Sequence, residues 1–549
     1  MKMKYFALGL LACVGMSSCS SSDDFTGDGG QNGGATASTS YLAVNILNTG
    51  STGSRAFSDG EADENDISEL RFYLFDEGGA AHTLANGKSY VTPTYTVGSN
   101  PTGGNVEEIG TAILSLEGIP QSIVAVANGT DLADTYTLTG LQAATTSAYK
   151  NASGDFTMSN SVYADKADGS GSKICAVSVS GHVASSQEAA KATPVDIYIE
   201  RLAAKVKVTF PSSDGWTTIG DKPAYLLSGT AGDAGAVYAQ IQGWDLVYVP
   251  NKENVLKDIE ATWKNDDLGY NGTTPWTSAD YHRSYWAKMP ASMTTNDFAK
   301  AFTPTGITNT APVYTLENTS ENNKTQLLVA VKLVDKDGKP SPRYVYLTEE
   351  YDSETAVLTQ MLSVFTNAQH QTYYVKTSSE DTENNYTSLA PSDLKFVSGA
   401  SLDDAAHSYR AYAQLKTPFA AAMEGEKENL YTKSEDGKYE KVADLATINN
   451  ALKKDYYAQI WKDGWCYYTS TIQHDGSDGK TAAYGVVRNH VYDITVKKIS
   501  GWGTPVYTPE QGTEQIPYPV IPEDDNSYVS TNINILSWKV VSKDVTLGQ

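Results

Sequence analysis

Alternating apolar and polar positions recur along the chain and predict a protein built mainly of β-strands. Residues 41–47 place Leu42, Val44 and Ile46 on one face, the period-2 pattern of a strand with one buried side. Residues 123–127 are apolar throughout, which is typical of a strand buried on both faces. The pattern therefore favours sheets packed against apolar cores.

The segment 195–210 carries two such patterns in opposite register. The first apolar set falls on odd positions and the second on even positions: Val195, Ile197 and Ile199, then Val206, Val208 and Phe210. Because side chains alternate across a strand, one continuous strand cannot bury both sets on the same face. We expect a bend or short break between 201 and 205. We place a domain boundary after Phe210, where a Pro-Ser-Ser-Asp-Gly linker begins.

The second half of the chain predicts a hairpin and two helices. Residues 327–334 and 343–347 flank an Asp-Lys-Asp-Gly-Lys sequence at 335–339, which favours a tight turn between paired strands. Apolar side chains recur at helical spacing in 442–454. A further helix is expected over 354–365.

A second alternating stretch closes the chain after a proline-rich lead-in. Its apolar face begins with Val529, Thr531, Ile533 and Ile535. The parity switches near 536, and Trp538 and Val540 continue a less regular half. Because an average strand has about 5–6 residues, we interpret 528–547 as two joined strands. The pattern alone does not decide between the last hairpin of its own domain and a strand that pairs elsewhere.

The N-terminus has the composition of a secretory signal. Two lysines precede an apolar stretch and small residues ahead of Cys19, a pattern typical of export and too short for a transmembrane helix. Residues 16–19, Met-Ser-Ser-Cys, resemble a lipobox, in which the cysteine is lipidated and becomes the new N-terminus. We assign 1–18 to the signal peptide and 19–40 to a lipidated, glycine-rich tether.

A polar loop follows the first strand. Residues 48–56 are small and polar, with one basic residue, Arg55, followed by Ala56. Exposed polar loop tips are preferred sites of proteolysis. An ordinary hairpin loop with a chance arginine has the same composition, so the residues alone leave both interpretations open.

Composition restricts the class of partner. The 549 residues suffice for two or three domains, and a net charge of −24 disfavours nucleic acid or an anionic membrane surface as partner. Few charges and many tyrosines suit an extracellular β protein. Beyond the signal and Cys19, only Cys175 and Cys466 remain. They can pair in an oxidising compartment or stay as two separate buried thiols.

No motif for catalysis, a metal or a cofactor emerges. The seven histidines lack metal-ligand spacing, and no G-x-S-x-G motif is present, so we do not expect an enzyme. A glycan-binding surface lipoprotein is the stronger alternative, because Trp286, Trp461 and Trp465 can stack on sugars. Aromatic-rich strands more often use these rings for core and cross-strand packing.

The order of these features resembles the Bacteroidales-type fimbrillins, most closely the major subunits of short fimbriae. The resemblance rests on the lipobox, the first strand with its Arg-Ala loop, and three stretches: IERLAAKVKVTF at 199–210, RNHVYDITV at 488–496 and LSWK at 536–539. It is strongest toward the C-terminus and loosest between 215 and 440.

This resemblance implies a mainly β fold with a few short helices. Two transthyretin-like β-sandwich domains are expected over 41–210 and 211–510, followed by a lead-in and donor-strand tail at 511–549. The implied function is that of a structural subunit of a surface fimbria, which supports adhesion. The precursor is expected on the outer membrane, held by its lipid.

The resemblance also implies how the subunits join. An arginine-specific surface protease cuts in the loop after the first strand, and Arg55 is the matching position. Loss of the strand that carries Leu42, Val44 and Ile46 opens a groove, which the tail 528–547 of another subunit fills. The implied partners are other copies of the chain, other fimbrial subunits and the protease. A cleavable strand and a tail together favour a shaft subunit over a tip or anchor subunit.

Overall fold

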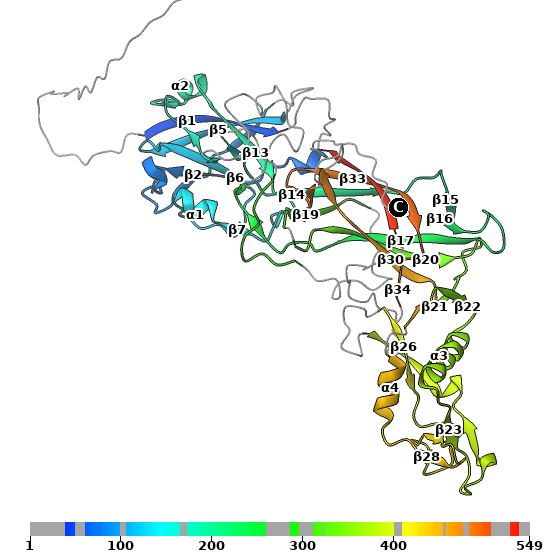
Figure 1. Ribbon diagram of the computed structural model, residues 1–549. Helices are drawn as coiled ribbons and strands as arrows, with labels where there is room; N and C mark the ends of the chain where they lie inside the picture. The colour runs from blue at the N-terminus through cyan, green and yellow to red at the C-terminus, as the bar shows by residue number, and fades with distance from the viewer. Residues whose placement is uncertain are drawn as a thin grey trace, which may run out of the picture. The chain divides into compact units, whose positions relative to one another are not determined.

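The computed structural model of the chain is mainly β, with four α-helices in its described part (Figure 1). It describes residues 39–49, 61–98, 106–164, 173–259, 286–295, 311–320, 322–399, 409–453, 457–475, 483–506 and 528–536. Within these ranges no helix is long and apolar enough to cross a membrane. The many strands and few helices of the described part confirm the predicted, mainly β fold class.

The first sheet contains ten strands and comes from the N-terminal part of the chain. Its main path is β3-β2-β6-β8-β13-β1-β5-β4, with β11 paired to β6 and β12 to β1. The strands are β1 (Thr39–Thr49), β2 (Leu70–Phe75), β3 (Tyr90–Val91), β4 (Tyr95–Val97), β5 (Val106–Glu117), β6 (Ser122–Ala127), β8 (Met158–Asn160), β11 (Val177–Ser178), β12 (Val183–Ala184) and β13 (Val195–Arg201). Ile123 and Ala125 of β6 pack in one core cluster, and Val124 and Val126 pack in another. Both faces of this apolar strand are thus buried, as predicted.

Two further sheets share one core in the C-terminal part. A four-stranded sheet has the order β19-β14-β33-β35, and a six-stranded sheet has the order β15-β16-β17-β20-β30-β34. Their bounds are β14 (Ala203–Thr209), β15 (Trp216–Ile219), β16 (Lys222–Ser228), β17 (Val237–Val247), β19 (Val313–Leu316), β20 (Gln326–Val334), β30 (Trp465–Thr471), β33 (Val491–Ser500), β34 (Thr504–Pro505) and β35 (Tyr528–Leu536). Tyr492 and Ile494 of β33 are buried in the same cluster as Val329 and Val331 of β20. This is the packing of a β-sandwich.

The chain passes from the first sheet to the second at Leu202. β13 ends one residue earlier, and β14 begins one residue later and pairs with β33 and β19. The break falls inside the interval in which the register change is expected. β14 therefore belongs to the predicted N-terminal domain 41–210 by position but to the C-terminal sheet by pairing. We propose Leu202 rather than Phe210 as the domain boundary.

A module with its own core occupies 343–461, inside the predicted C-terminal domain. It holds a five-stranded sheet, β22-β21-β29-β26-β25, and a four-stranded sheet, β24-β23-β27-β28. The elements are β21 (Arg343–Tyr346), β22 (Glu349–Tyr351), α3 (Glu354–Gln369), β23 (Tyr373–Lys376), β24 (Tyr386–Ser388), β25 (Leu394–Ser398), β26 (Ala411–Leu415), β27 (Tyr431–Lys433), β28 (Tyr439–Lys441), α4 (Leu445–Lys453) and β29 (Ala458–Trp461). Val357 and Phe365 of α3 are buried together with Ile448 and Leu452 of α4. The sequence patterns predict both helices but not that they build a separate core.

The predicted hairpin around 335–339 is wrong in its pairing. The tight turn is present, because the amide of Gly338 donates to the Asp335 carbonyl at 3.1 Å. β20 pairs with β17 and β30, however, whereas β21 pairs with β22 and β29 in the module. The turn reverses the chain correctly, but the following strand enters another sheet.

Short elements complete the described part. They are α1 (Leu138–Gln142), α2 (Gln187–Ala192), β7 (Thr145–Thr146), β9 (Tyr163–Ala164), β10 (Lys173–Ile174), β18 (Glu253–Asn254), β31 (Gln473–Asp475) and β32 (Ala483–Tyr484). β18 pairs with β7 and so ties the C-terminal part of the chain to the N-terminal part. Cys175 and Cys466 are both buried free thiols, which decides between the two possibilities that the sequence leaves open.

The fold makes Gly464 sensitive to substitution. It adopts φ +79°, and a Cβ there would lie 2.4 Å from the Leu333 carbonyl oxygen. We expect Gly464→Ala to lower the free energy of unfolding by about 3 kcal/mol or more, because left-handed strain and a backbone clash add. Gly437, at φ +83° with nothing within 4 Å of a Cβ, is the matched control, for which about 1–2 kcal/mol is expected. Equal losses for the two variants in urea unfolding would contradict the clash.

Candidate assembly site

β1 is an interior strand of the ten-stranded sheet. It pairs antiparallel with β5 along its whole length, from Thr39 to Thr49. On its other side it pairs in parallel with β13, from Val44 to Asn48, and β12 pairs with its first residues. Removal of β1 would therefore leave two strands with unpaired backbone groups on either side of the gap.

The side chains of β1 fill the core of this sheet. Leu42 and Val44, two of the three residues predicted on its buried face, have no exposed surface. They belong to the same cluster as Leu114 of β5 and Ile197 of β13. Burying such a side chain stabilises the fold by roughly 1.5–3 kcal/mol. The side chain of the third residue, Ile46, lies outside the described side chains.

Several predicted site residues fall outside the described part of the chain. These are Cys19, Arg55, Ala56, Trp538 and Val540. The described chain stops at Thr49 and resumes at Glu61. The connection between β1 and the rest of the fold is therefore the segment that contains Arg55.

The first half of the tail forms β35, which pairs antiparallel with β33 of the same chain. The register runs from Val491 opposite Leu536 to Ser500 opposite Tyr528, with a bulge after Val496. β35 is the last strand on its side of the four-stranded sheet. In the isolated chain this half of the tail thus adopts the alternative arrangement, as a strand of its own domain.

A buried anchor holds the first turn described after the segment that contains Arg55. Glu64 is 1% exposed, and its carboxylate accepts hydrogen bonds from Lys205 Nζ at 2.6 Å and from the Tyr314 hydroxyl. The Arg201 Nε donates to the Glu64 carbonyl at 2.9 Å. Although burial alone would raise it, the hydrogen bonds from Lys205 and Tyr314 hold the pKa of Glu64 below its usual value. Residues on both sides of the bend at Leu202 therefore hold Glu64, Arg201 by its backbone carbonyl and Lys205 by its carboxylate.

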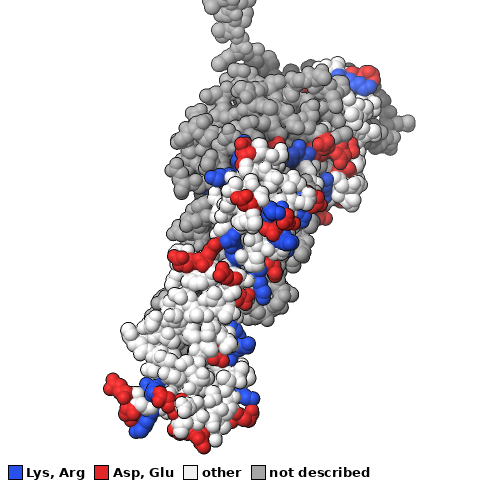
Figure 2. All heavy atoms as spheres, turned by 90° about the vertical axis from the view of Figure 1, so that its right-hand side faces the viewer, with Lys and Arg blue, Asp and Glu red and all other residues white. Residues whose placement is uncertain are grey.

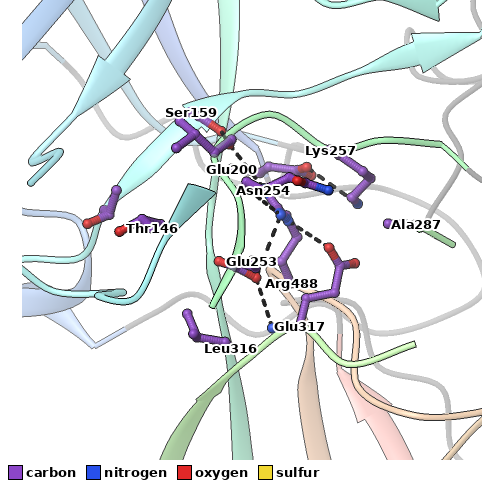
Figure 3. Close-up of polar contacts among 12 residues, drawn as sticks. Thr146, Ser159, Glu200, Glu253, Asn254, Lys257, Ala287, Leu316, Glu317 and Arg488 are labelled. Carbon is purple, nitrogen blue, oxygen red and sulfur yellow. Dashed lines mark hydrogen bonds and ion pairs between the residues drawn. The ribbon is translucent and has the colours of Figure 1, made fainter. Parts of the chain in front are cut away.

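A second buried cluster lies beside β13, β18 and the start of β33 (Figure 3). Arg488 donates from Nε to Glu317 at 2.9 Å and lies 3.6 Å from Glu253. Lys257 lies 3.4 Å from Glu200. Burial raises the pKa of Glu253 to about 8 against the attraction of Arg488, and the Glu317 carboxylate adds to the rise. The cluster joins segments far apart in the sequence around the Glu253 carboxyl group, whose pKa is raised.

Sequence reasoning missed these charged residues as site residues. Arg201 and Lys205 lie in the IERLAAKVKVTF stretch, and Arg488 opens the RNHVYDITV stretch. The available signal was a charged residue beside apolar positions that predict a buried strand, because such a charge needs a partner. The pattern does not reveal the partner, since Arg201 and Glu64 are distant in the chain.

Family models match the chain at both ends. The model of the major fimbrial subunit protein (FimA) matches residues 40–201, and the model of the C-terminal part of fimbrillin, a major fimbrial subunit protein of type IV, matches residues 459–544. Two parts of the chain are therefore similar to fimbrial subunits of the fimbrillin type. The first match spans β1 to β13 and ends where this chain changes sheets, at Arg201.

Solved structures show weaker similarity to this chain. A fimbrilin (fimA) from Porphyromonas gingivalis W83 is 14% identical, with TM-score 0.34, and the similarity covers 92% of this chain and 99% of that one. A putative cell adhesion protein from Parabacteroides distasonis ATCC 8503 is 12% identical, with TM-score 0.30 and coverage of 92% and 98%. The tip fimbrial protein Mfa3 from Porphyromonas gingivalis is 11% identical, with TM-score 0.26 and coverage of 90% and 99%. No curated protein matches the sequence.

No metal site accompanies these clusters. Within the described residues, no group of three or more His, Cys, Asp or Glu side chains has a geometry that could hold a metal ion. Three carboxylates of the buried clusters, Glu64, Glu200 and Glu317, instead pair with Lys205, Lys257 and Arg488 respectively.

The raised pKa of Glu253 predicts a stability that depends on pH. The folded chain keeps this proton up to about pH 8, whereas an unfolded glutamate loses it near pH 4.3. The contribution of this proton to the free energy of unfolding is therefore complete below the pKa of the unfolded chain. It is lost as pH rises toward 8, by at most about 1.4 kcal/mol per pH unit. We expect Glu253→Gln, measured by urea unfolding between pH 5 and 8.5, to flatten this decline.

A matched control comes from the surface. Glu188 on α2 is 83% exposed and pairs only with Lys191 in the described contacts, so Glu188→Gln should leave the pH profile unchanged. Glu253 faces Arg488, Glu317, Lys257 and Glu200. A decline that persists in full in Glu253→Gln would assign it to another group.

Proposed function

We propose that this fimbrial subunit forms the shaft of a surface fimbria by exchange of strands between subunits. The precursor is exported as a lipoprotein with Cys19 as the lipidated residue. An arginine-specific protease cuts after Arg55 and releases the segment that contains β1. The tail of a neighbouring subunit then occupies the groove between β13 and β5.

The interior position of β1 carries this proposal. Its removal leaves two unpaired strand edges and an apolar gap where Leu42 and Val44 are buried. An added strand satisfies the backbone groups and fills the side-chain positions together. The tail matches this requirement in length, since β35 has nine residues and β1 has eleven.

The pairing of β35 with β33 sets a condition on the exchange. Before donation, the tail must leave its own sheet, where it pairs with β33 from Tyr528 to Leu536. As the terminal strand of that path, β35 can detach without parting two other strands. Exchange is favoured once the groove of a neighbour is open, because the groove offers two strand edges and β33 offers one.

The glycan-binding alternative loses one of its three tryptophans. Trp461 is 2% exposed and packs in the sandwich core, so it cannot stack on a bound sugar. Trp286 packs against the buried His474. The shaft role is favoured over a tip or anchor role because the chain has both a first strand followed by Arg55 and a terminal tail.

Cleavage at Arg55 is expected to control assembly. The Arg55→Ala precursor, incubated with an arginine-specific protease, should stay monomeric by size-exclusion chromatography, because β1 remains in its sheet. The parent chain should form a ladder of oligomers under the same conditions. Arg283→Ala is the matched control and should behave as the parent. Oligomers formed by intact Arg55→Ala chains would overturn the processing step.

The tail is tested by a buried charge. In the proposed oligomer Ile535 enters the core of a neighbour, and an aspartate there would cost several kcal/mol. We expect Ile535→Asp to abolish oligomers after protease treatment and also to lower the melting temperature of the uncut monomer, because Ile535 pairs opposite the buried Tyr492 of β33. Asn534→Asp, on the opposite face of the strand, should retain them. Normal oligomers formed by folded Ile535→Asp subunits would contradict donation of the tail.

A further inference from the structure

Arginine is rare in this chain and unevenly placed. Seven of the 41 basic residues are arginine, and the other 34 are lysine. Five arginines lie in the described part: Arg71, Arg201, Arg343, Arg410 and Arg488. The other two, Arg55 and Arg283, lie outside it.

Each described arginine side chain is engaged with the fold. Arg201 and Arg488 are 0% and 1% exposed. Arg71 pairs with Glu69 at 2.7 Å and lies 5.1 Å from the Tyr90 ring centroid. Arg343 donates to both carboxylate oxygens of Glu350 and stacks on Trp502. The Arg410 guanidinium lies 4.3 Å from the Tyr457 ring centroid.

The backbone at these positions is engaged as well. Arg71, Arg201 and Arg343 lie within β-ladders, opposite Val126, Met158 and Trp461 respectively. The carbonyls of Arg410 and Arg488 accept hydrogen bonds from the Gly399 amide and the His490 ring. A protease needs an extended segment free of such pairing. The peptide bond after each of these arginines is therefore protected from cleavage until the structure opens locally.

Lysines occupy the positions that arginines avoid. Lys336 and Lys339 lie in the exposed turn after β20, and Lys438 lies in the turn between β27 and β28 with 78% of its side chain exposed. Basic and acidic side chains intermingle at the end of the module that carries these last two strands (Figure 2). The fold thus exposes basic residues at turns, but in the described part they are lysines.

We propose that the fold confines arginine-specific cleavage to the segment after β1 by packing its other described arginines and by placing lysine at exposed turns. This inference rests on the proposed processing at Arg55. It assigns selectivity to the substrate: the protease needs only to recognise arginine, because the folded chain withholds the remaining bonds. A lysine-specific protease would instead cut the turns and fragment the subunit.

The test compares two proteases on the folded full-length chain. All variants carry Arg283→Lys, so that Arg55 is the only arginine that remains outside the described part of the chain. We expect the arginine-specific enzyme to cut after Arg55. Cleavage after Arg71, Arg343 and Arg410 should be slower by a factor of roughly 100 or more. Intact mass and N-terminal sequencing identify the cut sites. The lysine-specific enzyme should cut the exposed turns. Rates after Arg71, Arg343 or Arg410 comparable to the rate after Arg55 would overturn the inference.

Moving an arginine separates the inference from the processing proposal. Lys336→Arg places arginine in the exposed turn after β20, outside the β-ladders, and should create a second cut by the arginine-specific enzyme. Lys332→Arg, in a paired position of β20 beside Trp465, is the matched control and should create none. Resistance of Lys336→Arg, or cleavage of Lys332→Arg, contradicts the inference. A parent chain that is not cut after Arg55 contradicts the processing proposal, while these two variants still decide the inference.

Discussion

The double pairing of β1 is the constraint on which the rest of the structure depends. β1 supplies backbone partners to β5 and β13 at once, and its side chains fill the core between them. The gap left by its removal cannot close by a shift of β13, because β13 continues through Leu202 into β14, which is paired with β33. The sheet without β1 therefore needs another strand, and it needs one of similar length and apolar character.

Buried charged side chains next to the bend at Leu202 hold β13 in place. Such charges lose hydration and are tolerated only when matched. Around Arg488 there are three carboxyl groups and two cations: Glu200, Glu253 and Glu317 against Lys257 and Arg488. A proton on Glu253 makes this set neutral, which agrees with its raised pKa. Nearby, Glu64 is matched by Lys205. Neutrality, rather than the number of ion pairs, is what lets this polar junction stay buried.

Local pattern predicted the parts of this fold that depend on one strand or helix at a time. The buried face of β1, the two buried faces of β6 and the break near Leu202 all follow from which residues alternate. Pairing between distant segments does not: β21 follows a correct turn yet joins the module, and β14 joins β33. Nothing local distinguishes a strand that pairs with its neighbour from one that crosses to another sheet. For the same reason Arg201 and Lys205 were visible as unusual charges, while their shared partner Glu64 was not.

The tail poses an energetic question that the pairing of β35 helps to answer. In the proposed exchange, the ladder bonds to β33 are given up and ladder bonds to β13 and β5 are formed. The ladder bonds lost to β33 are therefore replaced by bonds to one strand of the groove. The net gain comes from bonds to the second strand and from the apolar positions vacated by Leu42 and Val44. Neither exists while β1 is in place. The tail can thus be present from the start without causing premature assembly, because its better partner appears only when β1 has left.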